Sequence, residues 1–323
     1  MKSRVKTLLL AIGIGMVLPG ILFSISEKIL PRKTVDTFSE SDTEETSVTF
    51  PAEERRVVPV LQEDGTVLEM DFNTYLMGVL FGEMPVDFDI EALKAQAVVA
   101  RTYTLKRNTT GQKHENGAVC KNSACCQAYR SVLDVFATDS YEITKLKEAI
   151  QKTADEVLYY DGNLIEATYF SCSGGMTEDA CAVWGTDIPY LKAVDSPGEE
   201  NAEHYVDTVQ FTIDEFLSTL GISHTKEGSL FGDVTYTAGE GVETMEIGGV
   251  FFDGVTLREK LKLKSTSFQV VAVGDMIYIT TKGFGHRVGM SQYGAEAMAV
   301  KGHNYKEILS HYYPGTELLR YES

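Results

Sequence analysis

The residue of this sequence that is best suited to acid catalysis is Glu83. It follows Leu76, Val79 and Leu80 on one face of a predicted helix. Pro85 ends this helix, because its ring excludes helical geometry from the preceding residue. We therefore expect Glu83 to lie among apolar side chains at the negative end of a helix dipole, where the pKa of a carboxyl rises. A carboxyl that stays protonated near neutral pH can act as a general acid, although a solvent-exposed glutamate at a helix end would fit the same pattern.

A second predicted helix follows, and either Asp87 or Asp89 can cap it. Its buried side is marked by apolar and small residues at helical spacing, namely Leu93, Ala97, Ala100 and Thr104. Arg101 on this helix is a candidate to bind substrate or to pair with Glu83, with a structural ion pair as the alternative. Together with Glu91, the two aspartates are the nearby carboxylates that could serve as the second acidic group of a hydrolase.

A second group of candidate residues lies where a predicted strand ends in a glycine-rich turn. Hydroxyl groups there can bind sugar hydroxyl or acetamido groups, and paired glycines allow the backbone to approach a ligand. The candidates are Ser171, Ser173, Gly174 and Gly175. Trp184, the single tryptophan, can stack on a sugar ring, and Tyr190 can line the same groove. A plain strand–turn connection with a core tryptophan would explain the same residues.

A third group surrounds His286, which lies among glycines directly before a helix that Ser291 can cap. His286 can orient substrate or carry a proton, and it can equally be structural. Gln292 and Tyr293 follow and can reach the same cleft.

Three of the five cysteines lie close together between two predicted helices. His114, Cys120 and Cys126 are evenly spaced, and Cys125 can supply a fourth ligand. Histidine and thiolates at such short spacings favour zinc, which prefers tetrahedral nitrogen and sulfur ligands. We therefore predict a structural zinc site at His114, Cys120 and Cys126.

The alternative for the cysteines is a set of disulfides, which are common outside the cytoplasm. One bond would lie within the loop, and another would join Cys172 to Cys181. The adjacent Cys125 and Cys126 could bond to each other only with strain, which weakens an account based on disulfides alone.

A membrane segment is predicted at the N-terminus. Three basic residues precede an apolar run over residues 8–23 that continues to Ile25. This length suits a short transmembrane helix, with its basic side in the cytoplasm and the rest of the chain outside. A cleavable signal peptide is the alternative, because Ser24 and Ser26 resemble a cleavage site. We predict a cytoplasmic stub and membrane anchor over residues 1–26, and an acidic flexible tether over residues 27–56.

Length and composition allow one large domain or two modest ones after this tail. The 323 residues carry a net charge of −18, which argues against nucleic acid or anionic lipid as a main partner. Predicted helices and short strands alternate without a regular βαβ rhythm, so we predict an α+β fold over residues 57–323. A subdomain is expected as an insertion at about residues 196–267. The predicted strands lie at 57–62, 66–70, 157–160, 164–170, 268–273 and 276–281, with further short strands and glycine-rich turns over 233–253. Further helices are predicted at 141–156, 213–220 and 291–300.

Three blocks of this sequence resemble the stage II sporulation protein D family. They are GEMPVDFDIEALKAQAVVARTYTL (Gly82–Leu105), FSCSGGMTEDACAVWGTDIPYLKAVDSP (Phe170–Pro197) and GFGHRVGMSQYGAEAMAVKG (Gly283–Gly302), with a weaker match at GVTLREKLKLKSTSF (Gly254–Phe268). The resemblance covers the chain from about Val57 to Pro314. Members of the family usually carry a glycine where this chain has Arg287, so this residue is expected to add a polar contact.

The resemblance implies a membrane-anchored lytic transglycosylase that degrades peptidoglycan during engulfment of the forespore. In such an enzyme Glu83 would protonate the glycosidic oxygen between N-acetylmuramic acid and N-acetylglucosamine. As a carboxylate, it would then take the proton from the C6 hydroxyl of the muramic acid, and a 1,6-anhydro ring would close. No water is consumed, so one carboxyl is sufficient.

The resemblance also implies partners and a second hypothesis. Glycan strands of peptidoglycan would bind in a cleft, a cell-wall amidase would strip stem peptides, and a membrane scaffold protein of the engulfment machinery would localise the complex. Related domains are enhancers of cell-wall amidases, so a non-catalytic glycan-binding module is the alternative. The intact GEMP motif around Glu83 favours the enzyme.

Overall fold

The computed structural model describes residues 56–223 and 229–322. The predicted membrane anchor (residues 1–26) lies outside the described residues, and so does the predicted tether (residues 27–56) except for its last residue. In the described ranges, no helix combines the length and the apolar character that a membrane span requires.

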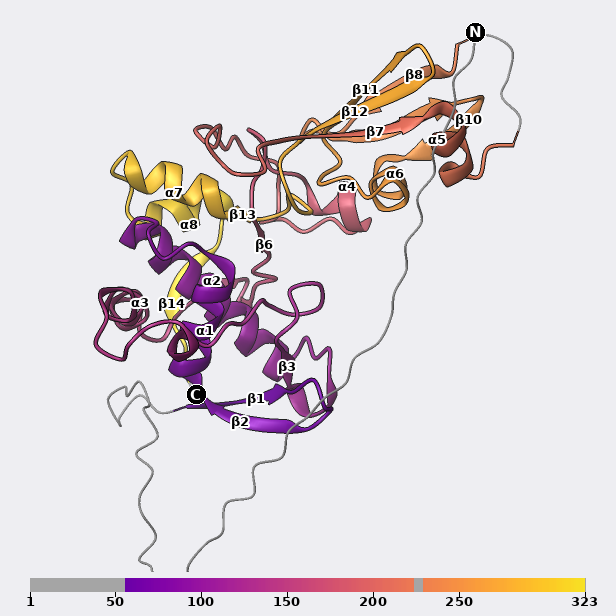
Figure 1. Cartoon of the computed structure of the whole chain (residues 1–323). Helices are drawn as coiled ribbons and strands as arrows, with labels where there is room; N and C mark the ends of the chain where they lie inside the picture. Colours follow the sequence, from indigo (N-terminus) through magenta and orange to yellow (C-terminus); the bar gives the residue numbers. More distant parts are fainter. Residues whose placement is uncertain (1–55, 224–228, 323) are drawn as a thin grey trace, which may run out of the picture. The chain divides into compact units, whose positions relative to one another are not determined.

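Eight α-helices are present in the described residues (Figure 1). They are α1 (Phe72–Glu83), α2 (Ile90–Thr109), α3 (Tyr141–Lys152), α4 (Ala180–Trp184), α5 (Ile213–Leu220), α6 (Gly254–Leu261), α7 (Gln292–Val300) and α8 (Tyr305–Tyr312). Two single 3₁₀ turns lie at Glu115–Gly117 and Val132–Asp134.

The strands of the described chain are short and form five small sheets. They are β1 (Val57–Leu61), β2 (Val67–Asp71), β3 (Val119–Cys120), β4 (Glu156–Tyr160), β5 (Asn163–Leu164), β6 (Tyr169–Phe170), β7 (Val206–Thr212), β8 (Phe231–Tyr236), β9 (Val242–Ile247), β10 (Val250–Asp253), β11 (Phe268–Val273), β12 (Met276–Lys282), β13 (Met290–Ser291) and β14 (Glu317–Arg320). The sheet orders are β2-β1-β3, β14-β4-β5, β13-β6, β11-β12-β7 and β10-β9-β8. Separate helices and small, mostly antiparallel sheets confirm the predicted α+β class.

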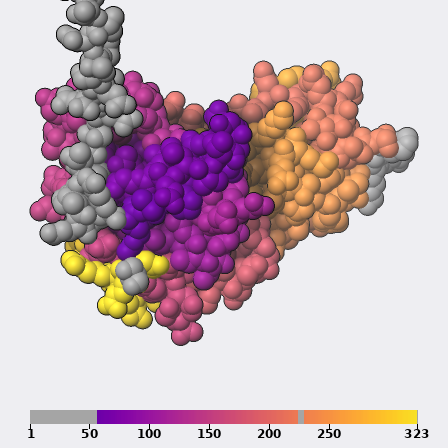
Figure 2. All heavy atoms as spheres, turned by 90° about the horizontal axis from the view of Figure 1, so that it is seen from below, coloured from indigo at the N-terminus to yellow at the C-terminus, as the bar shows by residue number. Residues whose placement is uncertain are grey.

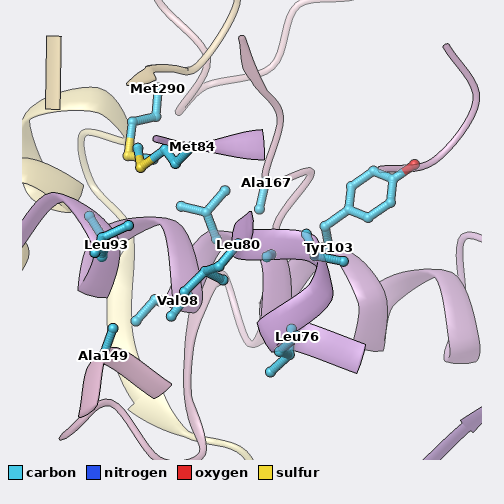
Figure 3. Close-up of a cluster of buried hydrophobic side chains, with 14 of the residues drawn as sticks. Leu76, Leu80, Met84, Leu93, Val98, Tyr103, Ala149, Ala167 and Met290 are labelled. Carbon is cyan, nitrogen blue, oxygen red and sulfur yellow. The ribbon is translucent and has the colours of Figure 1, made fainter. Parts of the chain in front are cut away.

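The main hydrophobic core is built around α1 and α2, which are buried on most of their faces. α2 packs against α3, α7 and α8, and Figure 1 shows the two yellow C-terminal helices beside it. Figure 3 shows side chains such as Leu80 of α1, Val98 of α2 and Ala149 of α3 gathered in one cluster. This close packing gives the end of α1 a rigid support.

The ends of α1 follow from its sequence. Asp71 caps the helix by accepting a hydrogen bond from the backbone N–H of Thr74 at 2.8 Å. Glu83 is its last residue, and Met84 is extended (φ −124°, ψ 141°), because the following Pro85 excludes helical geometry. The predicted end of this helix is confirmed.

The structure resolves one open choice and corrects two predicted elements. Asp89, and not Asp87, caps α2 by accepting from the backbone N–H of Glu91 at 2.8 Å. The helix predicted over residues 141–156 ends at Lys152. The strand predicted over residues 164–170 is wrong as one element, because β5 and β6 belong to different sheets.

Two distant parts of the chain meet in the smallest sheet. β6 and β13 pair in parallel, with Tyr169 opposite Met290 and Phe170 opposite Ser291. The hydroxyl of Ser291 accepts from the backbone N–H of Gly294 at 3.1 Å and so caps α7, as predicted. This pairing places the glycine-rich turn after β6 beside residues 283–292.

A second hydrophobic core lies in the segment between these two parts. Its buried residues come from α5, α6, β9, β11 and β12, and they include Phe216, Met245, Leu257 and Ile277. Because β11 and β12 contribute to it, this core extends beyond the predicted insertion at about residues 196–267. The orange atoms of this segment lie together in the space-filling view of Figure 2.

Candidate active site

A cleft of about 1040 Å³ lies where the end of α1 meets the segments around the β6–β13 pair. Its walls come from residues that are far apart in the sequence. They include Glu83, Tyr103, Arg107, Cys125, Cys126, Glu166, Tyr169, Ser171, Trp184, Arg258, His286 and Gln292. All three sequence blocks that carry the candidate residues therefore contribute to one cavity.

Glu83 projects its carboxyl into this cleft and is held by three neutral donors. Its Oε1 atom accepts from the backbone N–H of Ala128 at 2.5 Å and from the hydroxyl of Tyr169 at 3.1 Å. Its Oε2 atom accepts from Nε2 of Gln292 at 3.4 Å. Burial raises the pKa of Glu83 above its usual value, although the three hydrogen bonds lower it. The predicted direction of the pKa shift is thus found, and its main cause is desolvation.

A buried network continues behind Glu83. The hydroxyl of Tyr169 also lies 3.0 Å from Oε1 of Gln127, and the Gln127 amide donates to Oγ1 of Thr104 at 2.9 Å. The Thr104 hydroxyl in turn donates to the carbonyl of Ala100, which fixes the orientation of the Gln127 amide. A tyrosine hydroxyl has one proton, so Tyr169 donates either to Glu83 or to Gln127 at any moment.

The other carboxylate that lines the cleft, Glu166, is in a different electrostatic setting. It forms an ion pair with Arg107, and Lys106 lies 3.4 Å from its second oxygen. Glu83, in contrast, has no cationic partner among the described residues, and its three hydrogen-bond donors are neutral. Two acidic groups in one cleft are thus in contrasting environments.

The carboxylates considered as a second hydrolytic group do not line the cleft. Asp89 is engaged as the cap of α2. Glu91 forms an ion pair with Lys94 at 2.6 Å and accepts from the backbone N–H of Tyr305. Asp87 is exposed at the surface. None of the three is positioned to act with Glu83 on one glycosidic bond.

His286 lines the cleft, but its ring already forms two hydrogen bonds with the backbone. Its Nδ1 accepts from the N–H of Val288 at 3.1 Å, and it also hydrogen-bonds the backbone of Tyr169. Burial, assisted by the charge of Arg258, lowers the pKa of His286 to about 4, so the ring is neutral at pH 7. These contacts favour the structural role among the options that the sequence left open.

Trp184 forms an exposed aromatic surface in the cleft. It ends α4, and 44% of its surface is accessible. Its ring lies 5.3 Å from the ring of His286, which packs in turn against Phe170 at 5.7 Å. A partly exposed indole on such a support is suited to stacking against a sugar ring.

Arg101 was predicted to bind substrate, and the structure places it elsewhere. It is 2% exposed and does not line the cleft. Its guanidinium donates to the backbone carbonyls of Ile150 and Glu156 at 3.3 Å and 3.1 Å. It therefore satisfies one backbone acceptor in the last turn of α3, where carbonyls lack helical partners, and one at the start of β4.

Of the glycine-rich turn, only Ser171 lines the cleft. Ser173 is buried and donates from its hydroxyl to Glu199 at 2.8 Å, and the backbone N–H of Gly174 also points to that carboxylate. A Cβ atom at Gly174 would lie 2.8 Å from the backbone of Gly283. Gly174 thus serves the close packing of two loops, and the neighbouring Gly175 has a φ of +116° that favours glycine. Ser173, Gly174 and Gly175, which were predicted to contact substrate, do not line the cleft.

Of the other residues predicted to bind substrate, Gln292 lines the cleft, whereas Tyr190 and Tyr293 do not. The hydroxyl of Tyr190 accepts from the backbone N–H of Glu166 at 3.0 Å. The ring of Tyr293 packs edge-to-face on Phe88 at 5.1 Å. Both support the wall from inside, because their polar or aromatic groups are already engaged.

Arg287 has a positive φ of +65°, the region that favours glycine. Its buried guanidinium donates to the carbonyl of Ser173 at 2.9 Å, to that of Met176 at 2.8 Å and to that of Gly239. It also lies 4.0 Å from the buried carboxylate of Glu178. The expected polar contact exists, and it links the His286 loop to the β8–β9 turn.

The predicted metal ligands lie together beside the cleft, which Cys125 and Cys126 line. One ligand atom from each of His114, Cys120, Cys125 and Cys126 lies within 4.8 Å of all the others. Nε2 of His114 is 3.4 Å from Sγ of Cys125 and 3.6 Å from Sγ of Cys126. Ligands in a tetrahedral zinc site lie about 3.5–3.8 Å apart, as follows from the usual bond lengths, so the cluster fits zinc.

The disulfide alternative is not formed in the structure, where all five cysteines are free. Cys172 is buried and donates its S–H to Glu199 at 3.0 Å, whereas Cys181 is exposed. Burial raises the pKa of the Cys120 thiol, but hydrogen bonds from Asn122 and the neighbouring thiols outweigh it and leave the pKa below its usual value. A thiolate is the form that binds a metal.

The two residues that follow Cys126 connect the cysteine cluster to the surroundings of Glu83. Gln127 and Ala128 follow Cys126 directly, and they contact Tyr169 and Glu83. Sequence reasoning missed Tyr169, Gln127, Glu166 and Arg258 as site residues. Tyr169 had a sequence signal, since it directly precedes the second block, but the partners of Gln127 depend on long-range packing.

Comparisons with known proteins identify the family of this chain. The SpoIID family model, described as stage II sporulation protein, matches residues 62–160. The stage II sporulation protein D of Bacillus subtilis (strain 168) is 38% identical over 269 residues, which cover 81% of this chain and 78% of that protein. That of Bacillus amyloliquefaciens is 37% identical over 273 residues, with 82% and 79% covered. An amidase enhancer of Bacillus subtilis is 28% identical over 304 residues, with 76% of this chain and 40% of the enhancer covered. The chain therefore belongs to the stage II sporulation protein D family.

Proposed function

We propose that this protein is a peptidoglycan lytic transglycosylase in which Glu83 acts first as general acid and then as general base. The observation that carries the proposal is the contrast between the two carboxyls of the cleft. Glu83 is partly buried without a cationic partner among the described residues, and burial raises its pKa, whereas Glu166 forms an ion pair with Arg107 and lies close to Lys106. One protonated carboxyl is what a transglycosylase needs, while a hydrolase requires a second free carboxylate.

The reaction balances without water. Glu83 donates its proton to the oxygen that joins C1 of N-acetylmuramic acid to N-acetylglucosamine, and the C1–O bond breaks. The acetamido group of the substrate stabilises the positive charge at C1. The C6 hydroxyl then bonds to C1 and gives its proton to the Glu83 carboxylate, so a 1,6-anhydro ring forms and Glu83 is protonated again.

The cleft supports a glycan as substrate. Trp184 offers an exposed aromatic face, and the ring of His286 lies next to it. Such faces bind sugar rings through their apolar C–H surfaces. The volume of about 1040 Å³ accommodates several sugar units, which suits cleavage within a strand.

A zinc ion is proposed to have a structural role at His114, Cys120 and Cys126, with Cys125 available as a fourth ligand. When bound, zinc would supply rigid tetrahedral coordination and no chemistry on the substrate. The residues after Cys126 would then hold the backbone N–H of Ala128 in place for Glu83. No nucleic acid is expected to bind.

The family membership supports a role in sporulation, and we propose the engulfment of the forespore as the stage. The predicted anchor in residues 1–26 would hold the protein in the cell membrane, with its N-terminus in the cytoplasm and its catalytic part outside. A cell-wall amidase and a membrane scaffold protein of the engulfment machinery are the proposed partners. The amidase would remove stem peptides from the strands.

A second function is favoured by one relative, which is named an amidase enhancer. In this alternative the cleft holds glycan without cutting it, and the Glu83 carboxyl has no chemical task. The two functions can be separated because the first depends on an ionisable group at residue 83 and the second does not.

The test is digestion of purified glycan strands by the full-length protein in detergent. Glu83→Gln keeps the size of the side chain and the acceptor for Ala128 and Tyr169 but removes the ionisable group, and it is expected to abolish cleavage while strand binding is retained. Glu166→Gln is the matched variant of the other cleft carboxyl, and it is expected to keep measurable cleavage. Equal cleavage by the wild-type and Glu83→Gln proteins would refute the role of Glu83. No cleavage by any of them, with binding intact, would favour the enhancer.

A further inference from the structure

Arg258 stands apart from the other cations of the cleft. Three cationic side chains line the cavity, namely Arg107, Lys113 and Arg258. Arg107 forms an ion pair with Glu166, and Lys113 donates to the backbone carbonyl of Cys125. Within the described residues, the guanidinium of Arg258 forms no hydrogen bond and no ion pair. Its donors therefore remain available to a ligand.

A guanidinium without a partner is energetically unfavourable at this position, because the side chain is partly removed from water. Arg258 lies on α6 and is partly buried. Burial lowers the pKa of Arg258, and the charge of Glu259 offsets only part of this effect. A guanidinium still keeps its proton at neutral pH, so the cleft contains a partly desolvated positive charge without an ion-pair partner among the described residues. Partly desolvated cations of this kind are stabilised by an anion that completes their hydrogen bonds.

Arg258 also lies at the aromatic wall of the cleft. Its charge acts on His286, whose ring is 5.3 Å from that of Trp184. Trp184, His286 and Arg258 line the same cleft, so a glycan that stacks on Trp184 lies in a cavity that also contains the guanidinium. Carbohydrate recognition usually combines such an aromatic surface with a few polar groups that fix orientation.

We infer that Arg258 forms a carboxylate subsite that binds the lactyl group of a muramic acid residue. This inference rests on the proposed function, because it assumes a peptidoglycan strand in the cleft. N-acetylglucosamine is uncharged, whereas the lactyl ether of N-acetylmuramic acid ends in a carboxylate when it carries no peptide. The planar guanidinium matches a carboxylate in a bidentate pair. Arg258 would then set the register of the strand, because only every second sugar carries this group.

Binding can be measured through Trp184, the single tryptophan of the chain. The full-length protein with Glu83→Gln is used, so that strands are not cut, and its fluorescence is titrated with a peptide-free muramyl tetrasaccharide. The comparison ligand is the same tetrasaccharide with its lactyl carboxyls converted to amides. We expect the amidated ligand to bind about 10- to 100-fold more weakly, the usual effect of losing one charge-assisted hydrogen-bonded pair.

Variants of Arg258 complete the test. Arg258→Gln should bind both tetrasaccharides with equal affinity, and Arg258→Lys should keep part of the preference. Lys260→Gln removes a charge from the exposed side of the same helix and should keep the full preference. Equal binding of the two ligands by the protein that retains Arg258 would overturn the inference, whatever the folding of the variants.

Two further results distinguish the lactyl carboxylate from other anions, and a failure of the Arg258 subsite from a failure of the proposed catalysis. Free N-acetylmuramic acid should compete with the tetrasaccharide, whereas N-acetylglucosamine and acetate should not. Competition by acetate alone would mean a general anion site and would contradict the inference. A charge-dependent preference in a protein that never cuts glycan would sustain the Arg258 subsite and refute the transglycosylase.

Discussion

The hydroxyl of Tyr169 lies 3.1 Å from Oε1 of Glu83 and 3.0 Å from Oε1 of Gln127. This one hydroxyl can serve Glu83 in both of its protonation states. It donates to Glu83 when the carboxyl is ionised, and it can turn to donate to Gln127 when Glu83 is protonated. An acid that must become a base within one reaction cycle needs such a neighbour.

The first prediction concerns pH. Because burial raises the pKa of Glu83, the protonated form extends to higher pH than for an ordinary glutamate. Cleavage should therefore fall as the pH rises through this raised pKa, by about tenfold per pH unit on the alkaline side. The measurement is kcat/KM for strand cleavage between pH 4 and pH 9. A rate that increases continuously over this range would contradict a protonated Glu83.

The second prediction concerns Tyr169→Phe. Tyr169 lowers the pKa of Glu83 by donating to the ionised form, and a bond to a charged oxygen is stronger than one to the neutral acid. Its removal should raise the pKa of Glu83, so the alkaline limb of the pH profile should move to higher pH. Tyr305→Phe is the control, since its hydroxyl bonds Glu156 away from the cleft. A downward shift would count against the assigned hydrogen bond.

The third prediction concerns metal. Chelation should lower the Tm and the cleavage rate together, because the chain after Cys126 holds both Ala128 and Gln127 against the Glu83 site. The Tm of a domain of this size falls by about 2–4 °C for each kcal/mol of lost metal-binding free energy. Elemental analysis should find zinc in the wild-type protein and little in Cys126→Ser. Cys181→Ser, at an exposed position outside the cluster, should keep its zinc.

The fourth prediction concerns Arg287→Gly. Glycine would relax the positive φ, but Glu178 would then be buried without its cation, and three carbonyls would lose their donors. Removing one partner of a buried ion pair costs about 3–5 kcal/mol, so urea unfolding should show a large loss of stability. The double variant with Glu178→Gln should recover part of this loss. A glycine variant that is as stable as the wild type would mean that the pair contributes nothing.

Local sequence patterns were sufficient for the elements with clear signals. Rules that involve a few neighbouring residues predict the end of α1 before Pro85, the cap at Ser291 and the hairpin of β11 and β12. Short elements were missed, among them α4, α8 and β14. β14 exists because it pairs with β4, a contact across more than a hundred residues that no local pattern encodes.

The candidate site was predicted less evenly than the fold. Glu83 and Trp184 line one cleft, and the histidine and cysteines that we predict to bind zinc lie together, whereas their roles stay predictions. Arg101, Ser173 and Gly174 were assigned to substrate, but they satisfy buried backbone or carboxylate groups. A conspicuous motif can serve packing or catalysis, and only the three-dimensional partners distinguish the two. Arg258 is the opposite case. No sequence pattern marked it, and it became a candidate because its guanidinium lines the cleft without a hydrogen-bond or ion-pair partner among the described residues.

The most direct test of the central claim is the mass of the new strand ends after digestion in H₂¹⁸O. The full-length wild-type protein should yield muramic acid ends that are lighter than reducing ends by one water and that contain no ¹⁸O. Glu83→Gln should yield none of these products. Reducing ends that carry ¹⁸O would show that water attacks C1, which would contradict closure of the ring by the C6 hydroxyl.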